Sequence, residues 1–130
     1  MIKKLFALIL CGIIVFSFVA CRHEKPTSSV FDTENIARIT FYAYYGESEV
    51  PAEHMEEIIN WLKTFTFDKE FDEDDIPPGT NAYCVKIEYL DGTVIDEGLD
   101  MIEVDGTLYS IKHAEEPACF MEIMSNASHE

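Results

Sequence analysis

Two Asp-Gly pairs constrain the fold of this chain more than any other feature of its sequence. Asp91-Gly92 and Asp105-Gly106 each separate two short runs in which apolar and polar residues alternate. Such pairs suit tight hairpin turns that need positive φ, and the alternation is typical of strands with one buried face. Residues 83–112 are therefore predicted to form an antiparallel β-meander.

The residues before and after this meander add one strand and two helices. Residues 36–45 alternate as a strand, and Pro51 suits the first turn of a helix, where a missing N–H costs nothing. Five apolar residues share one face of that helix: Met55, Ile58, Ile59, Leu62 and Phe65. Residues 114–125 are predicted to form a closing helix. The predicted order is β-α-β-β-β-β-α, an α+β fold in which two helices pack on one face of an antiparallel meander sheet.

The N-terminal residues have the features of a secretory signal. Lys3 and Lys4 precede fifteen residues without a charge, and this apolar run ends in Ala20-Cys21. The run is shorter than the roughly 20 residues of a membrane-spanning helix and has the length of a signal-peptide core. A small residue followed by a cysteine allows cleavage by a signal peptidase and then acylation of the thiol.

The ending Phe18-Val19-Ala20-Cys21 resembles the lipobox of bacterial lipoproteins, with phenylalanine at the position usually held by leucine. The resemblance implies cleavage between Ala20 and Cys21. It also implies lipidation of Cys21, with acyl chains such as palmitate, and anchoring on the extracytoplasmic face of the cell membrane. The hairpins that end in the sequence DGTLYSI are similar to those of small uncharacterised lipoprotein ectodomains of Gram-positive bacteria. The envelope type, Gram-positive or Gram-negative, stays open.

The chain is accordingly divided into three parts. Residues 1–20 are the signal peptide, residues 21–35 are the lipidated cysteine and a flexible linker, and residues 36–130 are one ectodomain. The linker contains proline, threonine and serine without apolar periodicity, and it reaches roughly 45 Å when extended. The ectodomain is predicted to be a monomer.

The mature chain is strongly acidic. The whole sequence has 9 basic and 25 acidic residues, and removal of residues 1–20 takes away only Lys3 and Lys4, so the net charge becomes 7 − 25 = −18. This charge argues against nucleic acid as a partner and against attraction to an anionic membrane surface. The candidate partners are a cationic protein, a peptide, a sugar or a divalent metal ion, and the predictions favour a cationic protein or peptide, although the charge can also serve only solubility.

The acids gather in residues 68–80, which are predicted to form a loop because like charges and Pro77-Pro78-Gly79 oppose regular structure. The calcium candidates there are Asp72, Asp74 and Asp75. The segment lacks the glycine and the final glutamate of an EF-hand loop. Weak cation binding and a merely solvated loop therefore stay open beside a calcium site, and no dedicated metal site or cofactor is predicted.

The cysteines that remain after Cys21 is acylated are Cys84 and Cys119. They form a disulfide or remain two small buried residues, because an even pair in an exported domain permits either outcome. No histidine lies in a sequence context that suggests pairing with one of them, so a nucleophilic cysteine is not predicted. The sequence also has no HExxH, CxxC, GxSxG or phosphate-loop motif, and it predicts no enzyme and no zinc site.

The aromatic residues Tyr42, Tyr44, Tyr83 and Trp61 form either a binding surface for a peptide or glycan or a cover for a wet sheet face. Two functions agree with these features. The first is a lipid-anchored extracytoplasmic interaction module without catalytic activity. The alternative is an acidic inhibitor, or an envelope-stress protein, that captures a cationic enzyme or peptide.

Overall fold

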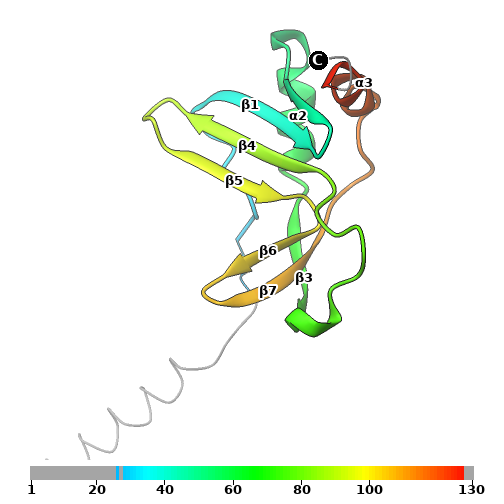
Figure 1. The fold of residues 1–130 in the computed structure, drawn as a ribbon. Helices are drawn as coiled ribbons and strands as arrows, with labels where there is room; N and C mark the ends of the chain where they lie inside the picture. The colour runs from blue at the N-terminus through cyan, green and yellow to red at the C-terminus, as the bar shows by residue number, and fades with distance from the viewer. Residues whose placement is uncertain (1–25, 27, 128–130) are drawn as a thin grey trace, which may run out of the picture.

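Within residues 26 and 28–127, the strands form two antiparallel sheets, and two helices accompany them (Figure 1). The computed structural model describes residues 26 and 28–127. The strands are β1 (Ile36–Ala43), β2 (Gly46–Glu49), β3 (Thr66–Phe71), β4 (Cys84–Tyr89), β5 (Val94–Gly98), β6 (Met101–Val104) and β7 (Thr107–Lys112). The helices are α2 (Met55–Leu62) and α3 (Ala118–Ala127), with short 3₁₀ turns η1 (Ala52–His54) and η2 (Glu73–Asp75).

The larger sheet has the strand order β2-β1-β4-β5. Residues Ile39 and Phe41 of β1 lie opposite Ile87 and Val85 of β4, and all four side chains are buried. Side chains alternate between the two faces of a strand, so the residues between them point to the other face. Tyr42 and Cys84 form such an outward pair.

The smaller sheet has the order β3-β7-β6 and lies below the larger one in Figure 1. The β6–β7 turn is the expected tight hairpin, because Asp105 and Gly106 both have positive φ, at 51° and 84°. In the β4–β5 turn, Gly92 alone of the Asp91-Gly92 pair has positive φ. Only Leu99 and Asp100 separate β5 from β6, so the two sheets are joined by a very short connection.

The core lies between the larger sheet and both helices. The ring of Phe41 contacts Trp61 of α2 and Phe120 of α3, with centroids 6.2 and 5.0 Å apart. Ile58 and Leu62 of α2 are fully buried, as the helical spacing predicts. Among residues 26 and 28–127, no helix has the length and apolarity needed to cross a bilayer.

The α+β class is confirmed, and the arrangement of the strands differs from the expected single meander. The expected order lacked two strands, β2 and β3, and the strands divide into two sheets. Residues 68–71, predicted as loop, belong to β3. Glu70 and Phe71 pair with β7 after an irregularity at residues 68–69, and this pairing satisfies backbone groups that a charged loop would leave to water.

The segment assigned to the linker also contributes to the domain. Phe31 is 2% exposed and its ring lies edge-on to Phe65 at 5.3 Å. The N–H of Val30 donates to the carbonyl of Phe65 at 3.2 Å. The folded domain therefore begins near residue 30 rather than residue 36. The predicted signal peptide, Ala20 and Cys21 lie outside the described residues.

Candidate functional site

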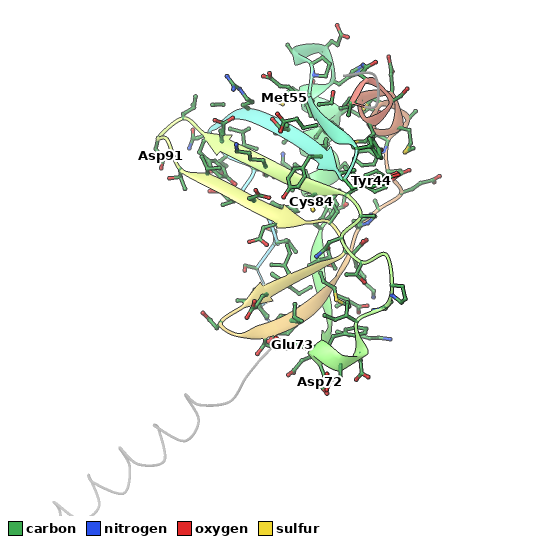
Figure 2. All side chains as sticks on the ribbon, viewed as in Figure 1. Tyr44, Met55, Asp72, Glu73, Cys84 and Asp91 are labelled. Carbon is green, nitrogen blue, oxygen red and sulfur yellow. The ribbon has the colours of Figure 1, made fainter. Side chains whose placement is uncertain are left out.

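An open groove lies between residues 30–35 and the β4–β5 hairpin. Its volume is about 500 Å³, and its lining comes from residues 30–35 and 89–95. Figure 2 places Asp91 at the tip of this hairpin. The volume falls within the range of small-ligand sites.

Hydrogen bonds to two backbone carbonyls fix the N-terminal wall of the groove. The hydroxyl of Tyr89 donates to the carbonyl of Asp32 at 2.6 Å, and the N–H of Leu90 donates to the carbonyl of Asn35 at 2.8 Å. Asn35 has φ of 57°, a left-handed conformation that asparagine tolerates better than most residues. The segment that the sequence assigns to a linker is thus held as one side of the groove.

The groove combines apolar surface with acidic groups. Leu90 is 71% exposed at its edge, and Val30 and Ile95 contribute further apolar atoms. The carboxylates come from Asp32, Glu34 and Asp91, and none of the described residues in the lining is basic. Hydrogen bonds from Thr93 lower the pKa of the Asp91 carboxyl, which keeps this group ionised. The arrangement suits a ligand with an apolar part and a positive charge.

The predicted calcium candidates lie at the opposite end of the molecule. Figure 2 shows Asp72 and Glu73 beyond the smaller sheet, far from Asp91. Asp72, Asp74 and Asp75 are all exposed, and a hollow on this surface is lined by Asp72 and Asp75 but not by Asp74. Within the described part of the chain, these three carboxylates do not converge as a set of metal donors.

The two cysteines are free thiols in this structure. Cys84 points to the outer face of the larger sheet, where its sulfur lies 3.5 Å from the carbonyl of Asn81. Cys119 belongs to α3, whose Phe120 packs on Phe41 at the inner face. The sheet separates the two side chains, so the fold does not favour a disulfide between them.

Cys119 has neighbours that sequence reasoning missed. His54, Glu57 and Cys119 each bring one donor atom within 4.8 Å of the others, so the fold places a histidine beside Cys119 that no sequence context suggested. Burial and hydrogen bonding to the Glu57 carboxylate raise the pKa of the Cys119 thiol to about 11, so the thiol is protonated at neutral pH. A nucleophilic cysteine needs a lowered pKa, so this environment does not suit covalent catalysis.

A weak sequence signal for this cluster does exist. His54 and Glu57 are three residues apart, as are Cys119 and Glu122, and residues at this spacing share one face of a helix. Each pair alone is unremarkable, because i, i+3 pairs of polar residues are common on helices. Only the packing of α3 beside the start of α2 brings them together.

The aromatic residues do not form one surface. Trp61 is buried, and its indole N–H donates to the carbonyl of Ala114 at 2.9 Å. The hydroxyl of Tyr42 donates to the Asp96 carboxylate on the outer face of the larger sheet, which raises the pKa of Tyr42. Tyr44 is 98% exposed and lies in the β1–β2 turn rather than on a sheet face. A continuous aromatic binding face is therefore absent from these four residues as the structure describes them.

Comparison of the chain with protein-family models, with curated proteins and with solved structures gave no significant match.

Proposed function

We propose that this chain is a lipid-anchored extracytoplasmic interaction module without catalytic activity, and that its groove binds a cationic, partly apolar peptide segment. The proposal of a peptide ligand rests on the lining of the groove, in which the exposed side chain of Leu90 and the partly buried Val30 and Ile95 lie beside three carboxylates. The first part rests on the apolar run that ends in Ala20-Cys21.

The short tether between Cys21 and the folded domain, residues 22–29, supports a location of the domain close to the membrane. Val30 already bonds to the domain, so only residues 22–29 separate Cys21 from the folded part. Nine residue steps span about 30 Å at full extension, compared with roughly 45 Å for the longer linker expected from the sequence. The groove is built partly from residues 30–35, where the tether enters the domain. A bound peptide would therefore lie within a short reach of the lipid headgroups.

Charge favours a cationic ligand. The mature chain would have a net charge of −18, from 7 basic and 25 acidic residues, and such a field raises the local concentration of cations. The groove adds apolar contact to this attraction. The affinity that comes from burying apolar surface is not screened by salt. The attraction of a cation to exposed carboxylates is screened, because the Debye length is about 8 Å in 0.15 M salt.

The alternative function is an acidic inhibitor, or an envelope-stress protein, that captures a cationic enzyme or peptide by its surface charge. The exposed acids of η2, at the end of the molecule opposite the groove, favour this alternative. The two functions differ in where the ligand binds and in how strongly salt weakens binding.

Binding of a fluorescent peptide that alternates leucine and lysine tests the groove. Asp32→Asn with Asp91→Asn should weaken binding severalfold in 0.15 M NaCl. Asp72→Asn with Asp74→Asn removes the same charge at the far end and should leave binding unchanged. Equal weakening by both double variants would favour capture by overall charge. A peptide with glutamate in place of lysine should not bind.

Metabolic labelling with a clickable fatty acid tests the anchor. Cys21→Ala should remove the label and leave an uncleaved precursor, because this change removes the acylated thiol. Cys11→Ala is the matched control and should retain the label. Label that remains on the Cys21→Ala protein would refute the lipoprotein assignment.

A further inference from the structure

The 3₁₀ turn η1, helix α2 and helix α3 bring a nitrogen, a carboxylate and a sulfur donor together at the end of the domain where α3 lies. We propose that His54, Glu57 and Cys119 form a binding site for a divalent transition-metal ion, with zinc as the preferred ion, and that Glu122 is its fourth ligand. The site is separate from the groove, which is built from residues 30–35 and 89–95.

The distances are close to those that a metal ion requires. Zinc binds nitrogen, oxygen and sulfur at about 2.0–2.3 Å, so the donors around a tetrahedral ion lie roughly 3.4–3.8 Å apart. The three donors in this structure lie within 4.8 Å of one another. The distances between the donor atoms would have to shorten by roughly 1 Å to hold a tetrahedral ion. Rotation of the exposed Glu57 side chain would supply part of this shortening.

Glu122 is positioned to complete the coordination. Its Oε2 atom lies 3.9 Å from Nε2 of His54, and it follows Cys119 by one turn of α3. The Glu122 side chain is mostly exposed, so it can move toward an ion without disturbing the core. Each helical segment then contributes two ligands from one face, His54 with Glu57 and Cys119 with Glu122.

The kinds of donor decide the class of ion. Calcium and magnesium prefer sites made only of oxygen atoms, whereas imidazole and thiolate ligands suit zinc and related transition metals. Cys119 is buried at the inner side of the site, and the exposed carboxylates leave an approach from solvent. A thiolate and two carboxylates bring three negative charges to a doubly charged cation. Binding would replace the thiol proton by the metal ion, with the proton released to water.

Chain connectivity shows what such an ion would do. His54 and Glu57 belong to the segment of η1 and α2, whereas Cys119 and Glu122 belong to α3, more than sixty positions later in the sequence. An ion bound by both segments would cross-link the closing helix to the rest of the core. Because the unfolded chain lacks this arrangement, ligand binding would add RT ln(1 + [L]/Kd) to the stability of the fold.

Metal titration of the full chain, purified in mild detergent and stripped of metal with a chelator, tests the proposal. The probes are zinc, measured by competition with a chromophoric chelator, and cobalt, whose thiolate complexes show a charge-transfer band in the near ultraviolet. The wild-type protein should bind one equivalent of zinc and show the cobalt–thiolate band. Cys119→Ser should abolish the band, and the matched control Cys84→Ser should retain it.

His54→Ala provides a second variant that does not alter the buried thiol. This change should weaken zinc binding by about tenfold or more, and Glu122→Gln should weaken it to a smaller extent. Zinc should raise the melting temperature of the wild-type protein and leave that of His54→Ala unchanged, while circular dichroism checks that each metal-free variant is folded. Absence of the cobalt–thiolate band from the wild-type protein, or its persistence in Cys119→Ser, would overturn the proposal.

Discussion

The carboxamide of Asn81 binds the backbone of Met101 at both polar atoms. Its Oδ1 accepts the N–H of Met101 at 2.9 Å, and its Nδ2 donates to the Met101 carbonyl at 3.2 Å. The same Oδ1 accepts the N–H of Asp100 at 3.0 Å. Asn81 comes shortly before β4 and Met101 begins β6, so one side chain joins the two sheets. A Cβ atom at Gly98 would lie 2.0 Å from this side chain, which explains the glycine there.

Asn81→Ala should therefore destabilise the protein by about 2–4 kcal/mol, because three hydrogen bonds are lost and alanine is strained at φ of 58°. Urea unfolding measures the effect. Asn81→Gly is the matched control, since it loses the same hydrogen bonds without the backbone strain. It should be more stable than Asn81→Ala by about 1 kcal/mol. A change within about 0.5 kcal/mol for Asn81→Ala would show that the sheets are held together by other contacts.

The spacing of apolar residues in the sequence correctly predicted the helix and the strand whose apolar side chains all lie on one face. The buried positions of α2 and β1 repeat at helical and strand spacing, so Ile58, Leu62, Ile39 and Phe41 could be placed in the core from the sequence. Trp61 follows Ile58 by three positions and precedes Phe65 by four, so it shares their helix face, but its indole N–H is a polar group whose burial requires a partner that the spacing does not provide. That partner is the carbonyl of Ala114, which lies two residues after the end of β7 and accepts the indole N–H.

Leu62→Ala tests the core that the spacing predicted. Leu62 is fully buried in α2, so truncation should leave a cavity and cost about 2–5 kcal/mol. Asp74→Ala in the exposed η2 turn is the control and should stay within about 0.5 kcal/mol of wild type. Chemical denaturation of both variants measures the difference. Equal stability of the two would mean that this face of α2 does not pack as described.

The division into two sheets could not be predicted, because it depends on contacts between distant residues. Strand β3 contains Asp68, Lys69 and Glu70 in succession, which is a loop signal in isolation, and pairing with β7 overrides it. Val30 and Phe31 are two adjacent apolar residues in a polar segment, and two neighbours do not establish a period. The His54 and Cys119 pairing was missed for the same reason, since no spacing within the sequence indicates that α3 lies beside η1.

Both described cysteines should remain free thiols in an oxidising environment, because the larger sheet lies between them. Mass spectrometry of the non-reduced protein should show alkylation at Cys84 and Cys119 after unfolding, and a reductant should not lower the melting temperature. In the folded protein at pH 8, alkylation of Cys119 should be slow, because burial and the Glu57 carboxylate keep its thiol protonated. A linked peptide that contains both cysteines would contradict the arrangement.

The stability of the metal-free protein should fall as pH rises from about 9 to about 11. The pKa of the Cys119 thiol is raised from 9.0 to about 11 in the fold, so in this interval the folded state retains a proton that the unfolded state has lost. The stabilisation is complete below pH 9 and is lost as pH rises through the pKa of the folded state, near 11. Urea unfolding in a chelator measures it. Cys119→Ala should show a shallower decline than wild type, and identical slopes would refute the raised pKa.

The acidic end of the molecule should attract cations without selecting among them. Asp72, Asp74 and Asp75 are exposed and do not converge, so they lack the fixed geometry of a calcium site. Diffuse attraction is screened in 0.15 M salt and does not distinguish calcium from magnesium. Melting temperatures in 0.15 M NaCl should therefore change equally and slightly with millimolar calcium or magnesium. A rise of several degrees with calcium alone, abolished by Asp72→Asn with Asp74→Asn, would instead establish a specific site, because only selective binding to the folded state stabilises in that way.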